Sequence, residues 1–195
     1  SRIAVKQAWG LSPEVLLKRG VRQGCPSSPI LFDVFINDLM ESCRSYGVEV
    51  PGLPEDHEHI PGLAFADDVA LLADSVEHLA QSLGKLEDWA TRWEQKIGAS
   101  KCGVMVFHGD MSMLHNHPWH LQGNPVPVVE AYTYLGVKFT TTAGVSDMIK
   151  ARLDVANKVV GALTPFLRSI SIPLAIRQLA LHSLVLSRCT YGSEV

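Results

Sequence analysis

The sequence lacks the features that mark membrane-spanning and secreted proteins. Its longest stretch without a formal charge, residues 111–129, holds three histidines and three prolines, so it cannot form a membrane-spanning helix. The first residues contain no apolar segment of the kind found in signal peptides. The four cysteines form no Cys-x-x-Cys pair, which favours reduced thiols over a disulfide framework. These absences predict an intracellular protein with no membrane partner.

An excess of positive charge is also absent. The 17 basic and 20 acidic residues give a net charge of −3, which is not the basic balance typical of an autonomous nucleic-acid binder. Residues 51–75 nevertheless contain six acidic side chains and no Lys or Arg (Glu55, Asp56, Glu58, Asp67, Asp68 and Asp74). From residue 150 onward, six basic side chains outnumber two acidic ones (Lys150, Arg152, Lys158, Arg168, Arg177 and Arg188 against Asp154 and Glu194). So dense an acidic group needs a compensating partner, either cations or distance.

A length of 195 residues suits one domain, or one core with a small appendage, and hydrophobic periodicity predicts that it mixes strands and helices. With 47% hydrophobic and 19% charged residues, the chain is typical of a folded protein rather than a disordered one. Pro165 is expected to kink or end a helix, and a boundary near Gly144 separates a mixed part from a helical, basic part. The expected elements are a helix from residue 28, a hairpin over 60–73, a helix over 75–93, strands over 102–107 and 131–139, and helices over 146–167 and 174–188.

Two adjacent carboxylates, Asp67 and Asp68, lie between two apolar runs that predict the strands of a hairpin. We expect these runs to bring the pair against a buried sheet, where two like charges cost several kcal/mol unless a cation neutralises them. Mg²⁺ is often held by only one or two protein carboxylates together with substrate phosphates. The pair therefore indicates a magnesium site for phosphoryl transfer, and the alternative is a solvated turn.

A loop over residues 20–29 combines several groups that suit a nucleotide. Arg22 offers a forked donor, Gln23 an amide and Gly24 a bare backbone that a base or sugar can approach closely. Pro29 follows at a position typical of a helix start, and exposed N–H groups there suit an anionic ligand. The alternative interpretation is a Pro- and Gly-containing loop that only redirects the chain.

Together these segments resemble reverse transcriptases of non-LTR (LINE-like) retrotransposons. Residues 20–39 are similar to that family's GxxQGCPxSPxLFxxxIxxL block, with Ser27 where a larger aliphatic residue is usual, and residues 65–68 resemble its F-A-D-D turn. Residues 98–102 match a lysine-containing block in which Asn is more common than Ala99. Tyr-Leu-Gly at 134–136 resembles a primer-grip strand pair, and residues 191–194 resemble the end of the following helices.

The resemblance implies an α+β fold that is a fragment of a right-hand polymerase. Residues 1–144 would form a partial palm, an antiparallel sheet with helices packed on one face, with a remnant of the fingers at the N-terminus. Residues 145–195 would form a helical, thumb-like segment whose basic side chains track a duplex backbone.

The resemblance also implies an RNA-directed DNA polymerase that joins nucleotides to a primer 3′-OH by two-metal catalysis. Asp67 would hold Mg²⁺, with Mn²⁺ as the other possible ion, and Asp68 would lie beside it. Lys101 would assist the leaving pyrophosphate, or would be only a surface lysine at a helix end. The remaining site residues implied are Arg22, Gln23, Gly24 and Phe65 for the nucleotide and template, and Tyr134, Leu135 and Gly136 for the primer.

The implied partners are an RNA template, a DNA primer and deoxynucleoside triphosphates in the full-length protein, located in the nucleus or the cytoplasm. The upstream aspartate block and the fingers of the family are missing, because residues 1–14 offer only Glu14 as an acid. We therefore predict that this piece is inactive alone. The assignment requires the acidic turn to lie near the Gln23–Gly24 loop rather than in bulk water.

Two other interpretations compete with a polymerase fragment. A degenerate retroelement remnant would act at most as a nucleic-acid or protein binding module. A metal-binding module could use His115, His117 and His120, but side chains at i and i+2 point to opposite faces of a strand and Pro118 prevents a helix. We favour solvated imidazoles in a loop for these histidines.

Overall fold

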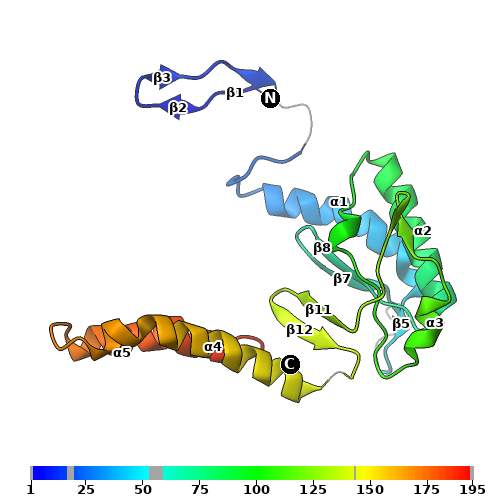
Figure 1. Cartoon of the computed structure of the whole chain (residues 1–195). Helices are drawn as coiled ribbons and strands as arrows, with labels where there is room; N and C mark the ends of the chain where they lie inside the picture. Colours follow the sequence, from blue (N-terminus) through cyan, green and yellow to red (C-terminus); the bar gives the residue numbers. More distant parts are fainter. Residues whose placement is uncertain (1, 17–19, 53–58, 143, 194–195) are drawn as a thin grey trace. The chain divides into compact units, whose positions relative to one another are not determined.

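The computed structural model describes all residues except 1, 17–19, 53–58, 143 and 194–195 (Figure 1). The described chain forms two compact units, Ser1–Glu94 and Gln95–Val195. Of the acidic residues expected to crowd the middle of the sequence, Glu55, Asp56 and Glu58 lie outside the described residues.

The N-terminal unit begins with an exposed two-part hairpin. In this hairpin β1 (Arg2–Ile3) pairs with β4 (Val15–Leu16), and β2 (Lys6–Gln7) pairs with β3 (Gly10–Leu11). Trp9 lies at its turn and is 86% exposed. A hairpin of two strands is marginally stable alone, so this segment contributes little to the core.

Two helices, α1 (Ser28–Cys43) and α2 (Val76–Arg92), form the core of this unit. The ring centroid of Phe35 on α1 lies 4.9 Å from the ring centroid of Trp89 on α2 and 5.3 Å from the ring centroid of Trp93. The helix predicted after Ser75 is confirmed, because the Ser75 hydroxyl caps it by accepting from the backbone N–H of His78. Four residues at the contact are fully buried (Leu39, Cys43, Ser82 and Ala90).

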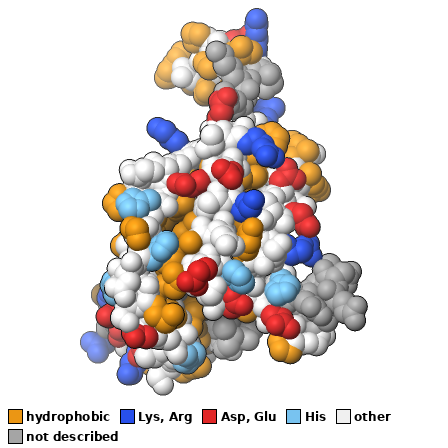
Figure 2. All heavy atoms as spheres, turned by 90° about the vertical axis from the view of Figure 1, so that its right-hand side faces the viewer, with side chains coloured by type: hydrophobic (Ala, Val, Ile, Leu, Met, Phe, Trp, Pro, Cys, Tyr) orange, Lys and Arg blue, Asp and Glu red, His pale blue; other side chains and the backbone are white. Residues whose placement is uncertain are grey.

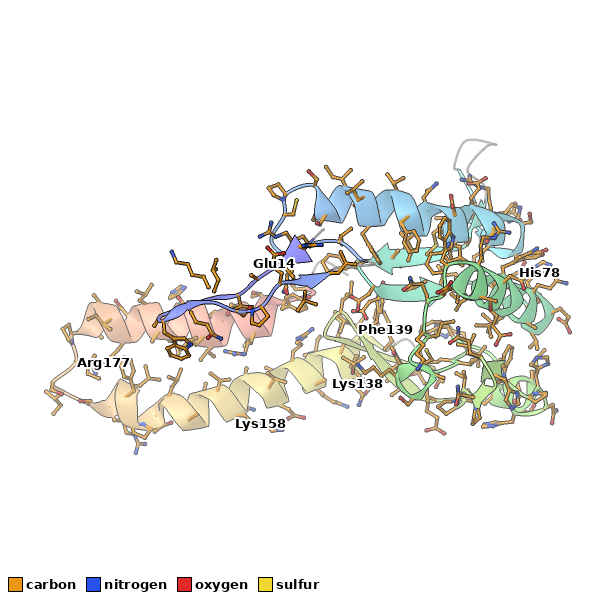
Figure 3. All side chains as sticks on the ribbon, turned by 90° about the horizontal axis from the view of Figure 1, so that it is seen from above. Glu14, His78, Lys138, Phe139, Lys158 and Arg177 are labelled. Carbon is orange, nitrogen blue, oxygen red and sulfur yellow. The ribbon has the colours of Figure 1, made fainter. Side chains whose placement is uncertain are left out.

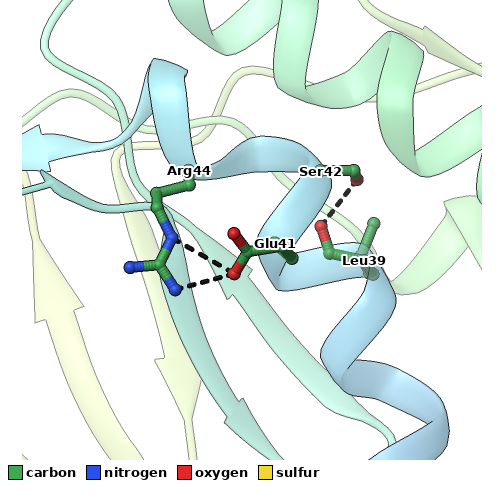
Figure 4. A network of polar contacts seen from close by, with 4 residues as sticks. All are labelled: Leu39, Glu41, Ser42 and Arg44. Carbon is green, nitrogen blue, oxygen red and sulfur yellow. Dashed lines mark hydrogen bonds and ion pairs between the residues drawn. The ribbon is translucent and has the colours of Figure 1, made fainter. Parts of the chain in front are cut away.

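Side-chain contacts fix the end of α1. Arg44 donates from Nε and Nη2 to the same Glu41 oxygen, at 3.2 and 2.7 Å, and the Ser42 hydroxyl donates to the Leu39 carbonyl (Figure 4). The chain then continues through a short 3-10 helix, η1 (Arg44–Tyr46), toward the first strands that follow.

The strands of the N-terminal unit form separate antiparallel pairs. After the first hairpin they are β5 (Val48–Glu49) with β6 (His59–Ile60), and β7 (Gly62–Phe65) with β8 (Asp68–Leu71). The latter pair confirms the predicted hairpin. Gly62 is required there because a Cβ at this position would lie 2.4 Å from the carbonyl oxygen of Ala70.

The C-terminal unit begins with short elements around a small core. These are η3 (Ala99–Lys101), α3 (Met111–His115), β9 (His120–Leu121), β10 (Asn124–Pro125), β11 (Ala131–Tyr134) and β12 (Val137–Thr140). The indole N–H of Trp119 donates to the Leu114 carbonyl at 2.8 Å, and both residues are buried. The predicted strand over 102–107 is wrong: Val104 alone forms a bridge, to Val128, because the facing segment contains prolines at 125 and 127 that have no N–H to donate.

The last third of the chain is helical, as predicted. It contains α4 (Val145–Arg168), α5 (Leu174–Leu181), a π-helical turn η4 (His182–Leu186) and α6 (Ser187–Thr190). Pro165 does not end α4, which continues to Arg168. Figure 3 shows α4 and the following helices side by side, with Lys158 on α4 and Arg177 near the connecting turn.

The observed fold class is a mixture of helices with small antiparallel strand pairs. Every sheet among the described residues has two strands, so the predicted palm sheet is represented here only by separate pairs. The predicted division into palm and thumb at residue 144 stays a prediction. Within the described part of the chain, no helix is both long and apolar enough to cross a membrane.

Candidate active site

The acidic pair lies at the turn between β7 and β8. Phe65 pairs with Asp68 across the hairpin, which leaves Ala66 and Asp67 as the two turn residues. Ala66 has a φ of 51°, a left-handed conformation that costs a residue with a Cβ roughly 1–2 kcal/mol. A positive φ at the first turn position is typical of the turns that match strand twist. Strain of this kind gathers at functional sites, which makes the turn a candidate site.

The structure corrects the expectation that this hairpin is buried. Asp67 and Asp68 are exposed, and the side chains of Leu63 and Phe65 are 54% and 64% exposed. The reason is that β7 pairs with β8 alone, so no further strand covers the hairpin among the described residues. Water therefore screens the repulsion between the two carboxylates. Because the pair is exposed, its repulsion does not by itself require a cation. The polymerase interpretation of this turn therefore depends on family membership.

The loop predicted to border the nucleotide is held by hydrogen bonds to its own backbone. The Ser28 hydroxyl donates to the Arg22 carbonyl at 2.8 Å, and the Cys25 amide donates to the same carbonyl at 3.2 Å. Gly24 has a φ of 81°, which favours glycine, and a Cβ there would meet no atom within 4 Å. The loop therefore exposes three neighbouring residues, Arg22, Gln23 and Gly24, and the space beside the Gly24 backbone is empty.

Cys25 lies where this loop enters α1. A hydrogen bond from the backbone of Ser27, and a second from the side chain of Ser28, lower the pKa of the Cys25 thiol. Burial instead raises the pKa of the Cys43 thiol, which lies inside the helix pair. The loop therefore presents a partly exposed cysteine with more thiolate character than an ordinary one.

The remaining predicted site residues belong to the C-terminal unit. Lys101 ends η3, where its amide donates to the Gly98 carbonyl at 2.8 Å and its carbonyl accepts from the Tyr132 hydroxyl at 2.5 Å. Tyr132 belongs to β11, so the strand that leads to Tyr134 also holds the backbone of Lys101. Lys101 and the predicted primer-grip residues therefore lie on connected parts of one unit.

The turn at Leu135 and Gly136 joins β11 to β12. Both residues have positive φ, 47° and 76°, which is the pattern of a type I′ turn. Both turn carbonyls accept hydrogen bonds from residues far along the chain. Arg152 Nη2 donates to the Gly136 carbonyl and the Tyr191 hydroxyl donates to the Leu135 carbonyl at 2.8 Å.

Sequence reasoning missed the structural roles of Ser28, Tyr132, Arg152 and Tyr191. Arg152 counted only as one of the basic residues expected along a duplex, and Tyr191 only as part of a closing motif. The Tyr191–Leu135 contact joins residues 56 positions apart, so no local spacing could indicate it. The hydroxyl at Ser28 belongs to the resemblance block, which was the one available signal.

The described residues offer limited means of holding a metal ion. Among them, no three His, Cys, Asp or Glu side chains come together as a possible metal site. On the face drawn in Figure 2 the histidines are interspersed with acidic, hydrophobic and other side chains and do not gather into a single patch. Asp67 and Asp68 still fit an ion such as Mg²⁺, which takes one or two carboxylates and completes its shell with water and phosphate oxygens.

The acidic hairpin turn and the Gln-Gly loop both lie in the part of the chain whose class a family comparison defines. The chain belongs to the reverse transcriptase (RNA-dependent DNA polymerase) family, whose model matches residues 6–139, more than half of the chain. This confirms the prediction of an RNA-directed DNA polymerase family. Members of this family work with a divalent metal cation.

The similar proteins come from insect mobile elements. The chain is 29% identical over 191 residues to the Pol polyprotein of the type-2 retrotransposable element R2DM of Drosophila melanogaster, covering 90% of this chain and 18% of that protein. It is 26% identical over 178 residues to the R2 polyprotein of Nasonia vitripennis, covering 87% and 17%. It is 30% identical over 124 residues to the RNA-directed DNA polymerase of the mobile element jockey of Drosophila melanogaster, covering 60% and 13%. The chain thus spans less than a fifth of these relatives. The similarity to R2 and jockey elements confirms the resemblance to reverse transcriptases of non-LTR, LINE-like elements.

Proposed function

We propose that this chain is part of an RNA-directed DNA polymerase that extends a DNA primer along an RNA template. The observation that carries the proposal is the pair of exposed carboxylates at the β7–β8 turn, inside the segment matched by the family model. In the proposed arrangement, residues 1–144 are a partial palm and residues 145–195 a thumb-like segment.

Asp67 and Asp68 would hold Mg²⁺, or Mn²⁺ in its place. When bound there, such ions would supply charge stabilisation for an in-line phosphoryl transfer. The exposure of both carboxylates supports this role, because an ion shared with substrate phosphates requires carboxylates that the substrate can reach. The strained φ of Ala66 supports it further, since it fixes the direction in which the turn presents Asp67.

The nucleotide would lie along the loop of Arg22, Gln23 and Gly24, with Phe65 at its side. Gly24 leaves the backbone open to a base or sugar, and Arg22 offers a forked donor to phosphate. Lys101 would act on the leaving pyrophosphate by charge or by proton donation. Its backbone is held at both the amide and the carbonyl, which would fix the origin of its long side chain.

The primer would lie on the β11–β12 hairpin at Tyr134, Leu135 and Gly136. Basic side chains of α4 and the following helices would contact the duplex backbone without regard to sequence. Lys150 supports this role because its side chain is 76% exposed.

Two carboxylates at one turn make an incomplete metal site, so the isolated chain is expected to be inactive. The test is primer extension by the purified chain with an RNA template, a DNA primer, nucleotides and Mg²⁺ or Mn²⁺. Wild-type chain and the Asp67→Asn variant should both give no product. Product from the wild-type chain that is lost in Asp67→Asn would contradict the expected inactivity and would support the proposed catalytic role.

Alkylation of Cys25 tests the nucleotide site without requiring catalysis. Because its pKa is lowered, Cys25 should react with iodoacetamide at neutral pH faster than Cys102, whose pKa is raised by burial. A deoxynucleoside triphosphate with Mg²⁺ should protect Cys25 in the wild-type chain and not in Asp67→Asn. Labelling of Cys102 is the internal control. Equal labelling of Cys25 with and without nucleotide would contradict the proposed nucleotide site.

A second candidate function is binding without catalysis, as expected of a degenerate retroelement remnant. It is favoured by one observation: among the described residues, no three His, Cys, Asp or Glu side chains come together as a possible metal site. Fluorescence anisotropy with an RNA–DNA duplex separates the two functions. Duplex binding that persists unchanged in Asp67→Asn with no nucleotide protection of Cys25 would favour the binding module.

A further inference from the structure

We propose that Arg152 and Tyr191 are positioning residues that fix the Leu135–Gly136 turn to the C-terminal helices, so that turn and helices bind a primer–template duplex as one body. The duplex-binding part of this inference rests on the proposed function. The attachment of the turn to the helices does not.

The two residues occupy both carbonyl groups of the turn. Arg152, on α4, donates from Nη2 to the Gly136 carbonyl, and the Tyr191 hydroxyl, just after α6, donates at 2.8 Å to the Leu135 carbonyl. The guanidinium carbon of Arg152 also lies 4.7 Å from the centroid of the Tyr191 ring. A cation over an aromatic face at this distance is attracted to it, so each donor holds the other in place.

Glycines allow the three segments to approach one another. Gly192 has a φ of 75°, and a Cβ there would lie 3.1 Å from a methyl group of Val137, the first residue of β12. A Cβ on Gly136 would lie 3.6 Å from the Tyr191 ring. Val137 is buried. The segment after α6 therefore packs directly on the turn, and its contact includes apolar atoms as well as hydrogen bonds.

The same hairpin is held at its other end. The Tyr132 hydroxyl of β11 donates to the carbonyl of Lys101, which lies at the end of η3. Helices, turn and the Lys101 backbone thus form a continuous series of side-chain-to-carbonyl contacts. A displacement of α4 and α6 would be transmitted to the turn and, through β11, toward Lys101.

The competing interpretation is that Arg152 binds a phosphate directly, as the charge pattern of the sequence suggests. One observation opposes it. Its guanidinium is already engaged by the Gly136 carbonyl and the Tyr191 ring. Direct phosphate contact by Arg152 would not involve the Tyr191 hydroxyl, so the two interpretations give different results for Tyr191→Phe.

Hydrogen–deuterium exchange of the 195-residue chain, without nucleic acid, tests the attachment of the turn. Tyr191→Phe removes the hydroxyl and keeps the ring, and Arg152→Gln removes the guanidinium. Either change should speed exchange in the peptide that covers β11 and β12 by about 2- to 10-fold, the range expected for one net hydrogen bond. Tyr46→Phe and Arg188→Gln are matched controls, because Tyr46 lies in the other unit and Arg188 donates to the Leu184 carbonyl of η4 rather than to the hairpin. Unchanged exchange in both test variants would overturn the proposal.

The second part of the proposal, that the turn and the helices bind the duplex as one body, is tested by the fluorescence anisotropy of a fluorescein-labelled RNA–DNA primer–template. Tyr191→Phe should weaken duplex binding about 2- to 10-fold. The double variant should bind only slightly less tightly than whichever single variant binds the duplex less tightly, because the two residues act as a unit. The slope of log K against log salt should stay unchanged, whereas loss of a direct phosphate contact reduces it by about 0.9.

A reduced slope in Arg152→Gln with normal binding by Tyr191→Phe would overturn the positioning role. If the wild-type chain does not bind the duplex although exchange responds as expected, duplex binding and the proposed function both fail. The attachment of the turn then stands as a structural feature alone.

Discussion

Two hairpins among the described residues, β7–β8 and β11–β12, both have four-residue strands and a two-residue turn, and they differ in what fixes the turn. In β7–β8 the turn at Ala66 and Asp67 presents carboxylates to solvent. In β11–β12 the turn at Leu135 and Gly136 has both carbonyls bound by side chains from distant residues. One turn therefore presents its side chains to solvent, where we propose that an ion binds, and the other is anchored through its backbone.

The two hairpin motifs differ in how much of their function can be predicted from their residue types. The Phe-Ala-Asp-Asp motif contains the side chains that would do the chemistry, so its four residues already suggest a function. The Tyr-Leu-Gly motif contributes mainly a type I′ backbone and two carbonyl acceptors. Its role depends on partners that lie 16 and 56 residues away.

The largest effect should come from Gly62→Ala in the first hairpin. The added Cβ would meet the Ala70 carbonyl at 2.4 Å, and backbone atoms cannot move aside as a flexible side chain can. We expect the free energy of opening of β7–β8, measured by native-state hydrogen exchange, to fall by about 2–3 kcal/mol. The exchange of β11–β12 is the internal control. A loss below about 0.5 kcal/mol would show that the strand pairing is less close than described.

Asp67→Asn should weaken ion binding at the first turn at least about tenfold, because a ligand is lost from a site with only two carboxylates. Broadening of the NMR signals of residues 65–69 by Mn²⁺ measures this effect. Asp74→Asn is the matched control, since its carboxylate is engaged by His78 at 2.7 Å on the start of α2. Broadening that is equally strong at the β11–β12 turn would remove the distinction between the two hairpins.

Gly136→Ala should destabilise the second hairpin by about 1 kcal/mol, because alanine tolerates a φ of 76° poorly. The cost is conformational and not steric, since the added Cβ would lie at an ordinary 3.6 Å from the Tyr191 ring. Native-state exchange of the β11–β12 peptide measures the change. An effect as large as that of Gly62→Ala would mean that the two glycines serve the same purpose.

The smallest effect should be a gain in stability from Ala66→Gly, of about 0.5 kcal/mol. Relief of the left-handed strain at a φ of 51° slightly exceeds the entropic cost of glycine. Nucleotide protection of Cys25 should fall at the same time, because the turn would present Asp67 less rigidly. Stability and protection that both rise would contradict a functional reason for the strain.

Sequence reasoning predicted the local features of the molecule and missed the non-local ones. The Ser75 cap, the β7–β8 hairpin and the apolar stripe of α2 follow from patterns a few residues long. The expected strand over 102–107 failed because its partner segment contains prolines, and strand pairing is decided by the partner as much as by the strand. The expected burial of Asp67 and Asp68 failed because apolar residues in a strand do not specify what covers them.

The candidate site followed from sequence only as a set of motifs. Nothing in the spacing of Arg152 or Tyr191 indicates that they contact the Leu135–Gly136 turn, because such contacts depend on how helices pack. The same limit applies to Ser28, whose hydroxyl shapes the loop at Arg22. Residues that position other residues are therefore the part of a site that motifs leave out.

The π-helical turn η4 sets the direction around the helix axis in which the following side chains point. Residues His182–Leu186 place one more residue in a turn than an α-helix would, and Tyr191 follows five residues later. Each residue advances an α-helix by roughly 100°, so removing one residue from η4 would rotate everything downstream by about a quarter turn. The phenol would then point away from the hairpin, which makes the wide turn a spacer whose length matters more than its composition.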